Sequence, residues 1–419
     1  MADYKTTDSN PSDRGLVSIT GFAIGGLDYP DLRQLTIKEI VLGENILTPG
    51  LQTAITFQNS IYLPAGKWFD RMKAQPVRFT LSREWHDGNY SLALAGQIAY
   101  RLDNRSFKPV NVAHIEEFTL HACHESLLND ARSLMSKSWK CTSPSDIVKK
   151  ALDCAGVSDT SEVMDSDPQR DYIAENIHPF QVINQQSNVA LYNGTPDFVH
   201  FMTYGWDTGN STPKHHFKSI KYLCSQGPIW TYEYADTGQG RDGNPVTGDF
   251  SNPSAIISFE FPCDFDYLTD ILNGLENGNR NTVATLNPFS KSMATYGGQG
   301  GDECGIGGYN YKMAITNMGT AKDQNSCNLD VEQHLLKRQA RMSLLDRDRI
   351  ALRMVVPWNP ILHVGKVISF RWSNKYEPGT SVYGEGDYLI TGLSHVIRTG
   401  GFSTTAIDCV SKTVGEGEV

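Results

Sequence analysis

Two β-patterned regions, one toward each end of the chain, enclose a middle section with helical periodicity, and this arrangement limits the possible folds most strongly. From Leu16 onward, Val, Ile, Thr and Phe recur at alternate positions between turns rich in Gly, Asn and Pro. The same alternation returns at residues 349–357 and 363–372. Between them, residues 125–135 carry apolar residues at helical spacing. We predict an α+β, β-dominated fold, with two small antiparallel, tube-like β-barrel domains and an inserted helical and mixed α/β part.

Changes in composition divide the 419 residues into parts. Residues 277–328 are rich in Gly and Asn and have almost no periodicity, which is typical of an insertion or an extended arm. The expected parts are a flexible N-terminal arm (1–14), a first β-barrel domain (15–122), a helical and mixed α/β domain (123–250), a second β-barrel domain (251–276 and 329–413), the insertion (277–328) and an acidic tail (414–419).

Capping residues locate the helices of the middle section. Pro144 and Gly156 have the positions expected of a helix start and a helix stop. A second helix is predicted to begin at Pro179. Residues 329–346 also have helical periodicity.

The chain is acidic, with 37 Lys and Arg against 47 Asp and Glu and a formal net charge of -10. Because nucleic-acid binding depends on clustered cations that release counterions, we expect no sequence-specific nucleic-acid binding. The polar N-terminus has no apolar signal-peptide core, and no window approaches the roughly 20 apolar residues of a membrane helix. We therefore expect synthesis in a cytoplasm and no membrane insertion.

The cysteines are scattered and form no CxxC pair. In a reducing cytoplasm, isolated cysteines are more often buried thiols than disulfides or metal ligands. We expect reduced thiols, while an occasional bridge can form under oxidising conditions. The eight residues are Cys123, Cys141, Cys154, Cys224, Cys263, Cys304, Cys327 and Cys409.

Two groups of histidines are candidates for a metal site: His114, His121 and His124, and the adjacent pair His215 and His216. The first group fits no zinc-binding helix motif, and no paired cysteine lies near it. Adjacent residues on a strand point to opposite faces, so the pair does not easily ligate one ion. We expect no metal and no other cofactor.

Patterns for catalysis are weak throughout. Glu116 and Glu117 are adjacent, so their side chains alternate across a strand and do not face each other as in a glycoside hydrolase. The sequence has no GxSxG elbow and no recognisable cysteine-protease signature. Residues 297–308 are Gly-rich but lack the Lys-Ser/Thr ending of a phosphate-binding loop. We therefore predict that the chain is not an enzyme and has no catalytic, metal-binding or cofactor-binding residues.

Three ordered segments carry a more specific pattern. Residues 116–157 pass from a strand to helices through Ser136-Lys137-Ser138-Trp139-Lys140, Ile147-Val148 and Leu152. Residues 177–227 contain Pro179-Phe180, Phe198 to Tyr204 and His216 to Ile220. Residues 352–412 contain Val356-Pro357-Trp358-Asn359, Leu362-His363-Val364-Gly365, Tyr388 to Thr391, His395, Thr399 to Phe402 and Thr404-Thr405. In this order the segments resemble the baseplate hub proteins of contractile phage tails, a family related to late control D proteins and to the hub part of type VI secretion spike proteins.

The resemblance implies a structural role. In that family each chain has two barrels, and three chains form a ring of six similar barrels around a channel. Such a homotrimer joins a sixfold tail tube to a threefold central spike and forms part of the DNA conduit. The implied partners are a separate spike protein, tube or tube-initiator proteins, baseplate wedge proteins and the tape measure protein. The implied location is the tail baseplate of a virion.

Two other functions stay open. Some tail proteins degrade cell walls, so a tail-tip cell-wall hydrolase is one alternative. The Trp, Tyr and Gly content also suits a carbohydrate-binding adsorption protein. Unlike type VI spike proteins, the sequence has no hexapeptide repeats of a β-helical needle, which is why the spike is expected to be a separate chain.

Overall fold

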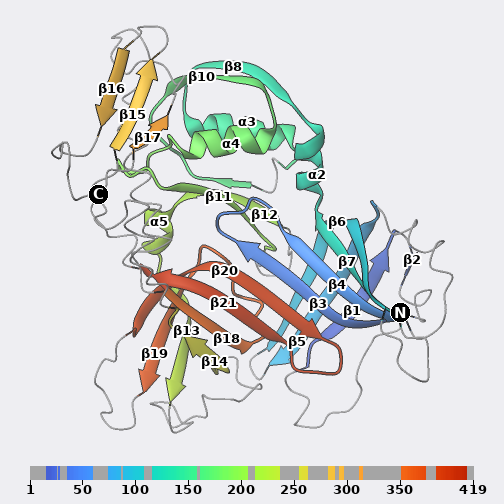
Figure 1. Cartoon of the computed structure of the whole chain (residues 1–419). Helices are drawn as coiled ribbons and strands as arrows, with labels where there is room; N and C mark the ends of the chain where they lie inside the picture. The colour runs from blue at the N-terminus through green and yellow to red at the C-terminus, as the bar shows by residue number, and fades with distance from the viewer. Residues whose placement is uncertain are drawn as a thin grey trace.

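The computed structural model describes residues 16–25, 27–28, 35–59, 74–85, 88–107, 116–157, 161–205, 213–235, 254–262, 282–287, 292–296, 311–314, 351–373 and 384–412. Strands predominate in these residues, and the helices come from the middle of the chain (Figure 1). The predicted α+β, β-dominated fold class is therefore confirmed. Within the same residues, no helix is long and apolar enough to span a membrane.

The first β region consists of seven antiparallel strands that hydrogen-bond in the order β3-β4-β7-β6-β5-β1-β2. Their inward side chains form one core, in which the ring of Phe57 lies 5.3 Å from Phe118 and 5.8 Å from Phe22. This core explains the alternation of apolar residues in the sequence. The strands are β1 (Ser18–Ile24), β2 (Leu27–Asp28), β3 (Leu35–Asn45), β4 (Gln52–Asn59), β5 (Pro76–Trp85), β6 (Gly88–Phe107) and β7 (Glu116–His124).

The second β region lies at the lower left of Figure 1 and has its own core. Its strands pair in the order β14-β18-β21-β20, and β19 pairs with β20 and, in parallel, with β13. Phe370 and Tyr388 are buried at its centre. The strands are β13 (Pro228–Ala235), β14 (Ser258–Glu260), β18 (Ala351–Pro357), β19 (Val367–Ser373), β20 (Gly386–Arg398) and β21 (Thr404–Ser411).

The two β regions are joined by direct strand pairing. β20 lies antiparallel to β3, from the pair Gly392 and Asn45 to the pair Arg398 and Glu39. Both regions therefore belong to one 13-stranded sheet, although they bury separate cores. Among the described strands, the main path of this sheet runs from β14 to β2, and β19 and β13 branch from it at β20.

A mixed α/β block covers the junction of the two regions (Figure 1). It contains a two-stranded sheet of β8 and β10, a three-stranded sheet in the order β11-β12-β9, and helices that pack between them. The elements are α2 (Glu125–Arg132), β8 (Met135–Thr142), α3 (Pro144–Cys154), β9 (Ser161–Val163), β10 (Arg170–Ile177), α4 (Pro179–Ser187), β11 (Phe198–Thr203), β12 (Lys214–Ser219) and α5 (Ile220–Cys224).

The starts of α3 and α4 agree with the predicted signals, whereas α2 ends at Arg132, and Met135, at the end of the predicted helical stretch 125–135, begins β8. α3 begins at Pro144, and the Ser143 hydroxyl accepts a 3.2 Å hydrogen bond from the Asp146 N–H at its N-terminus. Gly156, just after α3, has a positive φ of 75°, which glycine adopts without strain. α4 begins at Pro179, as predicted.

The segment 277–328 contributes three strands despite its weak periodicity. β15 (Thr282–Asn287) pairs antiparallel with β16 (Ser292–Tyr296) and parallel with β17 (Tyr311–Ala314). In Figure 1 this separate sheet lies beside the left end of β10 and β8. Backbone pairing, which a hydrophobicity pattern does not reveal, defines these strands.

Several predictions fall outside the described residues: the helix over 329–346, the Gly-rich stretch 297–308, the arm 1–14 and the acidic tail 414–419. The domain boundaries stay a prediction. The topology does place β13, which is within the expected 123–250 domain, beside β19 of the second β region.

Candidate functional site

The histidines singled out in the sequence lie on several elements. His121 and His124 are on β7, and His114 is outside the described residues. His215 and His216 are neighbours on β12 and point to opposite sides of its sheet, as predicted: His215 contacts His200, whereas His216 contacts Glu162. Among the described residues, no three His, Cys, Asp or Glu side chains form a group that could hold a metal ion.

Two of these histidines, His124 and His215, form a buried hydrogen-bonded chain with Ser126 and with His200, which the sequence had not singled out. We call it the histidine–serine chain. The His124 Nδ1 lies 2.8 Å from the Ser126 Oγ. The same oxygen lies 3.0 Å from His215 Nε2, and His215 Nδ1 lies 3.1 Å from His200 Nε2. All four side chains are buried.

The start of α2 fixes the direction of donation along this chain. His124 is the N-cap of α2, and its Nδ1 accepts a 3.3 Å hydrogen bond from the backbone N–H of Ser126. That nitrogen therefore carries a lone pair, so the Ser126 hydroxyl donates to it and accepts from His215 Nε2–H. His215 Nδ1 then accepts from His200 Nε2–H. Each donor in the chain has one acceptor when all three imidazoles are neutral.

Burial keeps these imidazoles neutral. Desolvation lowers the pKa of His124 to about 4 and that of His200 to about 3. It also lowers the pKa of His215 well below its usual value, and the neighbouring histidines lower it further. The chain connects the end of β7 to β11 and β12, so it joins the first β region to the mixed block. Because Ser126 is fully buried, its hydroxyl is not accessible to a substrate.

A second buried polar junction is centred on Glu44 of β3, whose side chain is fully buried. Its carboxylate accepts hydrogen bonds from the backbone N–H of Tyr204 at 2.8 Å and of Val364 at 3.0 Å. The Nδ1 of His363 lies 3.4 Å from the same carboxylate. Burial opposes ionisation, but His363 and the two N–H groups together lower the pKa of Glu44. One charged side chain thus connects the first β region, the end of β11 and the turn before β19.

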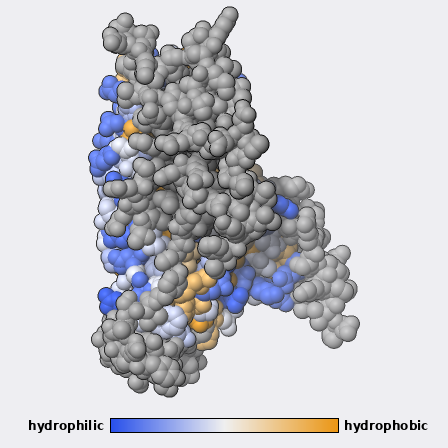
Figure 2. Space-filling view, turned by 60° about the vertical axis from the view of Figure 1, so that its left-hand side comes forward, coloured by the Kyte–Doolittle hydropathy of each residue, from blue (hydrophilic) through white to orange (hydrophobic). Residues whose placement is uncertain are grey.

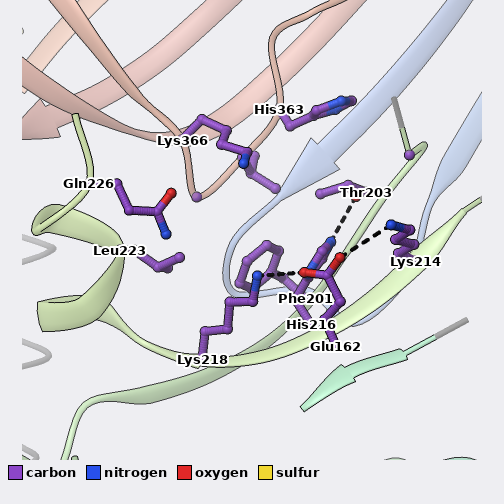
Figure 3. Close-up of a pocket in the computed structure, with 13 residues that line it drawn as sticks. Glu162, Phe201, Thr203, Lys214, His216, Lys218, Leu223, Gln226, His363 and Lys366 are labelled. Atoms are coloured by element: carbon purple, nitrogen blue, oxygen red, sulfur yellow. Dashed lines mark hydrogen bonds and ion pairs between the residues drawn. The ribbon is translucent and has the colours of Figure 1, made fainter. Parts of the chain in front are cut away.

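A solvent-open pocket lies between the mixed block and this turn (Figure 3). We call it the lysine pocket, after the three lysines at its edge: Lys214 and Lys218 on β12, and Lys366 on the turn opposite. The carboxylate of Glu162 on β9 lies 3.2 Å from Lys214 Nζ and 2.6 Å from Lys218 Nζ. The pKa of Glu162 is lowered, mainly because its carboxylate contacts His216. Burial opposes this lowering, and Lys218 adds to it.

The floor of the lysine pocket is aromatic. The ring of His216 stacks on Phe201 at a centroid distance of 4.9 Å, and its Nε2 lies 2.9 Å from the Thr203 hydroxyl. Burial lowers the pKa of His216, so this ring is neutral near pH 7. Gly365 closes one side, where a Cβ would meet Phe201 at 2.8 Å, and its φ of 79° also favours glycine.

The remaining candidates have structural surroundings. Glu117 makes a 2.9 Å surface ion pair with Lys38, and the register places Glu116 opposite Asn59. Cys141 is disulfide-bonded, so the expectation of reduced thiols is wrong at this position. That expectation came from the compartment alone, which does not determine the pairing of an individual cysteine. Cys123, Cys154, Cys224 and Cys409 are free thiols, as expected.

Sequence reasoning missed Glu44 and the lysine pocket. The pattern Lys214-His215-His216-Phe217-Lys218 does contain a signal, because alternation places the two lysines and His216 on one face of β12. Glu44 has no such signal. An acidic residue near the end of a strand is normally at the surface, and only the tertiary structure brings Tyr204 and Val364 to it.

Comparison with known proteins identifies the fold. No protein family model matches the sequence, and no curated protein is similar to it. The structure is similar to a tail protein from Neisseria meningitidis, with a TM-score of 0.55 and 11% identity over 95% of this chain and 98% of that chain. It is also similar to the 43 kDa tail protein of prophage MuSo2 from Shewanella oneidensis, with a TM-score of 0.52 and 8% identity over 94% and 98% of the two chains. The chain therefore has the fold of phage tail proteins, which confirms the suspected resemblance at the level of the fold.

Proposed function

We propose that this chain is the baseplate hub of a phage-type contractile tail. Three copies form a ring that joins the sixfold tail tube to the threefold central spike, and the ring forms part of the DNA conduit. The role is structural rather than enzymatic, and the site of action is the tail baseplate of a virion.

The observation that carries the proposal is that one chain contains two β regions with separate cores, joined in one sheet through β3 and β20. Three such chains present six β regions, so a threefold ring can face a sixfold tube. Closed rotation satisfies each contact between neighbouring chains, because every chain meets the next in the same way. The shared fold with two phage tail proteins supports this proposal.

The two buried junctions also support it. An adaptor between two coaxial parts must hold its β regions in a fixed relative orientation. Glu44 ties the first β region to the turn before β19, and the histidine–serine chain ties it to β11 and β12. Both junctions are buried, where polar interactions depend strongly on geometry. They therefore resist rotation of one part against another.

The net charge is consistent with a DNA conduit. The whole chain has a formal net charge of -10, and if the channel surface shares this sign it repels phosphate, so DNA can pass without binding. The partners in this role are a separate spike protein, tube or tube-initiator proteins, wedge proteins and the tape measure protein.

Light scattering on the purified chain tests the proposal. A trimer has a mass of about 140 kDa, three times the 46.5 kDa of one chain. The same sample should release no fragments from purified peptidoglycan, and its elution should not shift when surface glycans of the host are added. A monomer that cleaves peptidoglycan would instead support the cell-wall hydrolase, and a glycan-dependent shift would support the adsorption protein.

A further inference from the structure

The lysine pocket is locally cationic in an acidic protein. With His216 neutral, Lys214, Lys218 and Lys366 contribute three positive charges, and Glu162 contributes one negative charge. The pocket therefore has a net charge of about +2 from its lining residues. The whole chain, in contrast, has a net charge of -10.

The cations of the pocket are not equally neutralised. Lys214 and Lys218 share the carboxylate of Glu162. Lys366 extends from the opposite turn and, among the described residues, its ammonium group has no ion pair (Figure 3). All three lysines line the same open space, with Lys366 on the side opposite β12 (Figure 3). An anion that enters this space contacts Lys366 directly and shares Lys214 and Lys218 with Glu162.

The size of the space limits the ligand. The cavity has a volume of about 70 Å³, whereas one water molecule needs roughly 10–15 Å³ on the same measure. A carboxylate fits in this volume with a few waters, whereas a nucleotide or a sugar chain is too large to be enclosed by it. Phe201 and Leu223 supply an apolar wall that suits the carbon atoms of an acetate-like group or an acidic side chain.

We infer that the lysine pocket is a binding site for a single carboxylate group, held by Lys366, Lys218 and Lys214 above the ring of His216. The carboxylate can come from a free organic acid or from an acidic side chain of a second copy of this chain. The site stands on its own geometry and does not depend on the proposed role of the chain as a hub.

The site is tested with acetate as the probe, compared with chloride at equal ionic strength so that general screening cancels. In the wild-type chain, acetate at tens of millimolar should raise the melting temperature by about 1–3 °C relative to chloride. Lys366→Gln and Lys218→Gln should each weaken acetate binding about tenfold, because each removes one charged hydrogen-bond donor. Lys366 is exposed, so its substitution leaves folding intact.

Glu162→Gln has the opposite expected effect and makes the test sharper. It removes the internal carboxylate that competes for Lys214 and Lys218, so acetate should bind several times more tightly. The matched control is Lys149→Gln, because Lys149 also pairs with carboxylates, Asp146 and Asp165, but lies on α3 outside the pocket. This control should bind acetate like the wild type.

The source of the carboxylate is identified by sedimentation of the same variants. If a second copy supplies it, Lys366→Gln weakens self-association, and acetate competes with assembly. If a free acid supplies it, self-association is unchanged and acetate still binds to the assembled chain. The inference is overturned if the acetate-dependent shift and the self-association are both the same in the wild type, Lys366→Gln and Glu162→Gln. None of these results requires a trimer, so a monomeric chain would refute the hub role and leave this test intact.

Discussion

The backbone N–H of Val364 donates a 3.0 Å hydrogen bond to the carboxylate of Glu44, which lies 320 residues earlier in the chain. The same carboxylate accepts a hydrogen bond from Tyr204 in the mixed block. Three parts of the structure that lie far apart in the sequence therefore meet at one buried charge. The orientation of the two β regions depends on this contact as well as on the pairing of β3 with β20.

Glu44→Gln should destabilise the fold strongly. Glutamine has one side-chain oxygen where glutamate has two, so it cannot accept hydrogen bonds from the N–H groups of Tyr204 and Val364 through two separate oxygens. Its buried NH₂ group would instead lie against one of these N–H donors. Loss of one partner from a buried charged network costs about 3 kcal/mol or more. The loss is measured as the decrease in the free energy of unfolding in urea, at a fixed protein concentration. The control is Glu39→Gln on the same strand, whose partner Arg398 is at the surface, with an expected cost below about 1 kcal/mol. Equal effects of the two substitutions would contradict the assigned role of Glu44.

Ser126→Ala should weaken the junction between the first β region and the mixed block. The substitution leaves the Nε2–H of His215 without its acceptor and His124 without the hydroxyl donor. An unsatisfied buried donor costs about 1–3 kcal/mol of unfolding free energy. Ser136→Ala, at an exposed position of β8, serves as the control and should change stability by less than about 0.5 kcal/mol. A cost for Ser126→Ala as small as that of the control would show that the chain contributes nothing to stability.

Stability should fall as the pH decreases from about 6.5 to about 4. The folded-state pKa values of His124 and His395 are about 4, and that of His200 is about 3, because burial disfavours the charged form. In this window the unfolded chain takes up protons that the folded chain does not, so the free energy of unfolding decreases with decreasing pH. Well above pH 6.5 both states are neutral at these residues, and their contribution to the pH dependence vanishes.

His395→Gln checks this sign. Removing one buried histidine should reduce the number of protons taken up on unfolding near pH 5.5 by about one, measured from the slope of stability against pH. Stability that is constant between pH 7 and pH 5 in the wild-type chain would contradict the neutral state of the buried histidines.

Cysteine labelling should separate the described cysteines into three groups. Cys154 is exposed and free, so it should react with a maleimide in the folded protein. Cys123, Cys224 and Cys409 are buried, and burial raises the pKa of Cys123 and Cys409, so these thiols should react only after denaturation. Cys141 should react only after reduction. Labelling of Cys141 in the denatured but unreduced protein, mapped by mass spectrometry, would show that its disulfide is absent.

The fold class and most local elements were predictable because they follow from periodicity and capping. The helix starts at Pro144 and Pro179 and the strands at both ends are examples. The pairing of β3 with β20 and the strands β15 to β17 were not predictable, because hydrophobicity shows which face of a strand is buried but not which strand is its neighbour. The candidate sites were least predictable. Glu44, Glu162 and Lys366 each look like ordinary surface charges in the sequence, and only the tertiary structure brings their partners to them.

The number of β regions in the assembled ring tests the proposed function most directly. We predict that cryo-electron microscopy of the purified assembly shows threefold symmetry with six β regions around a central channel, two from each chain. Within each chain, density for β20 should lie beside β3. A ring with one β region per chain, or a particle without threefold symmetry, would contradict the proposal that this chain matches a sixfold tube to a threefold spike.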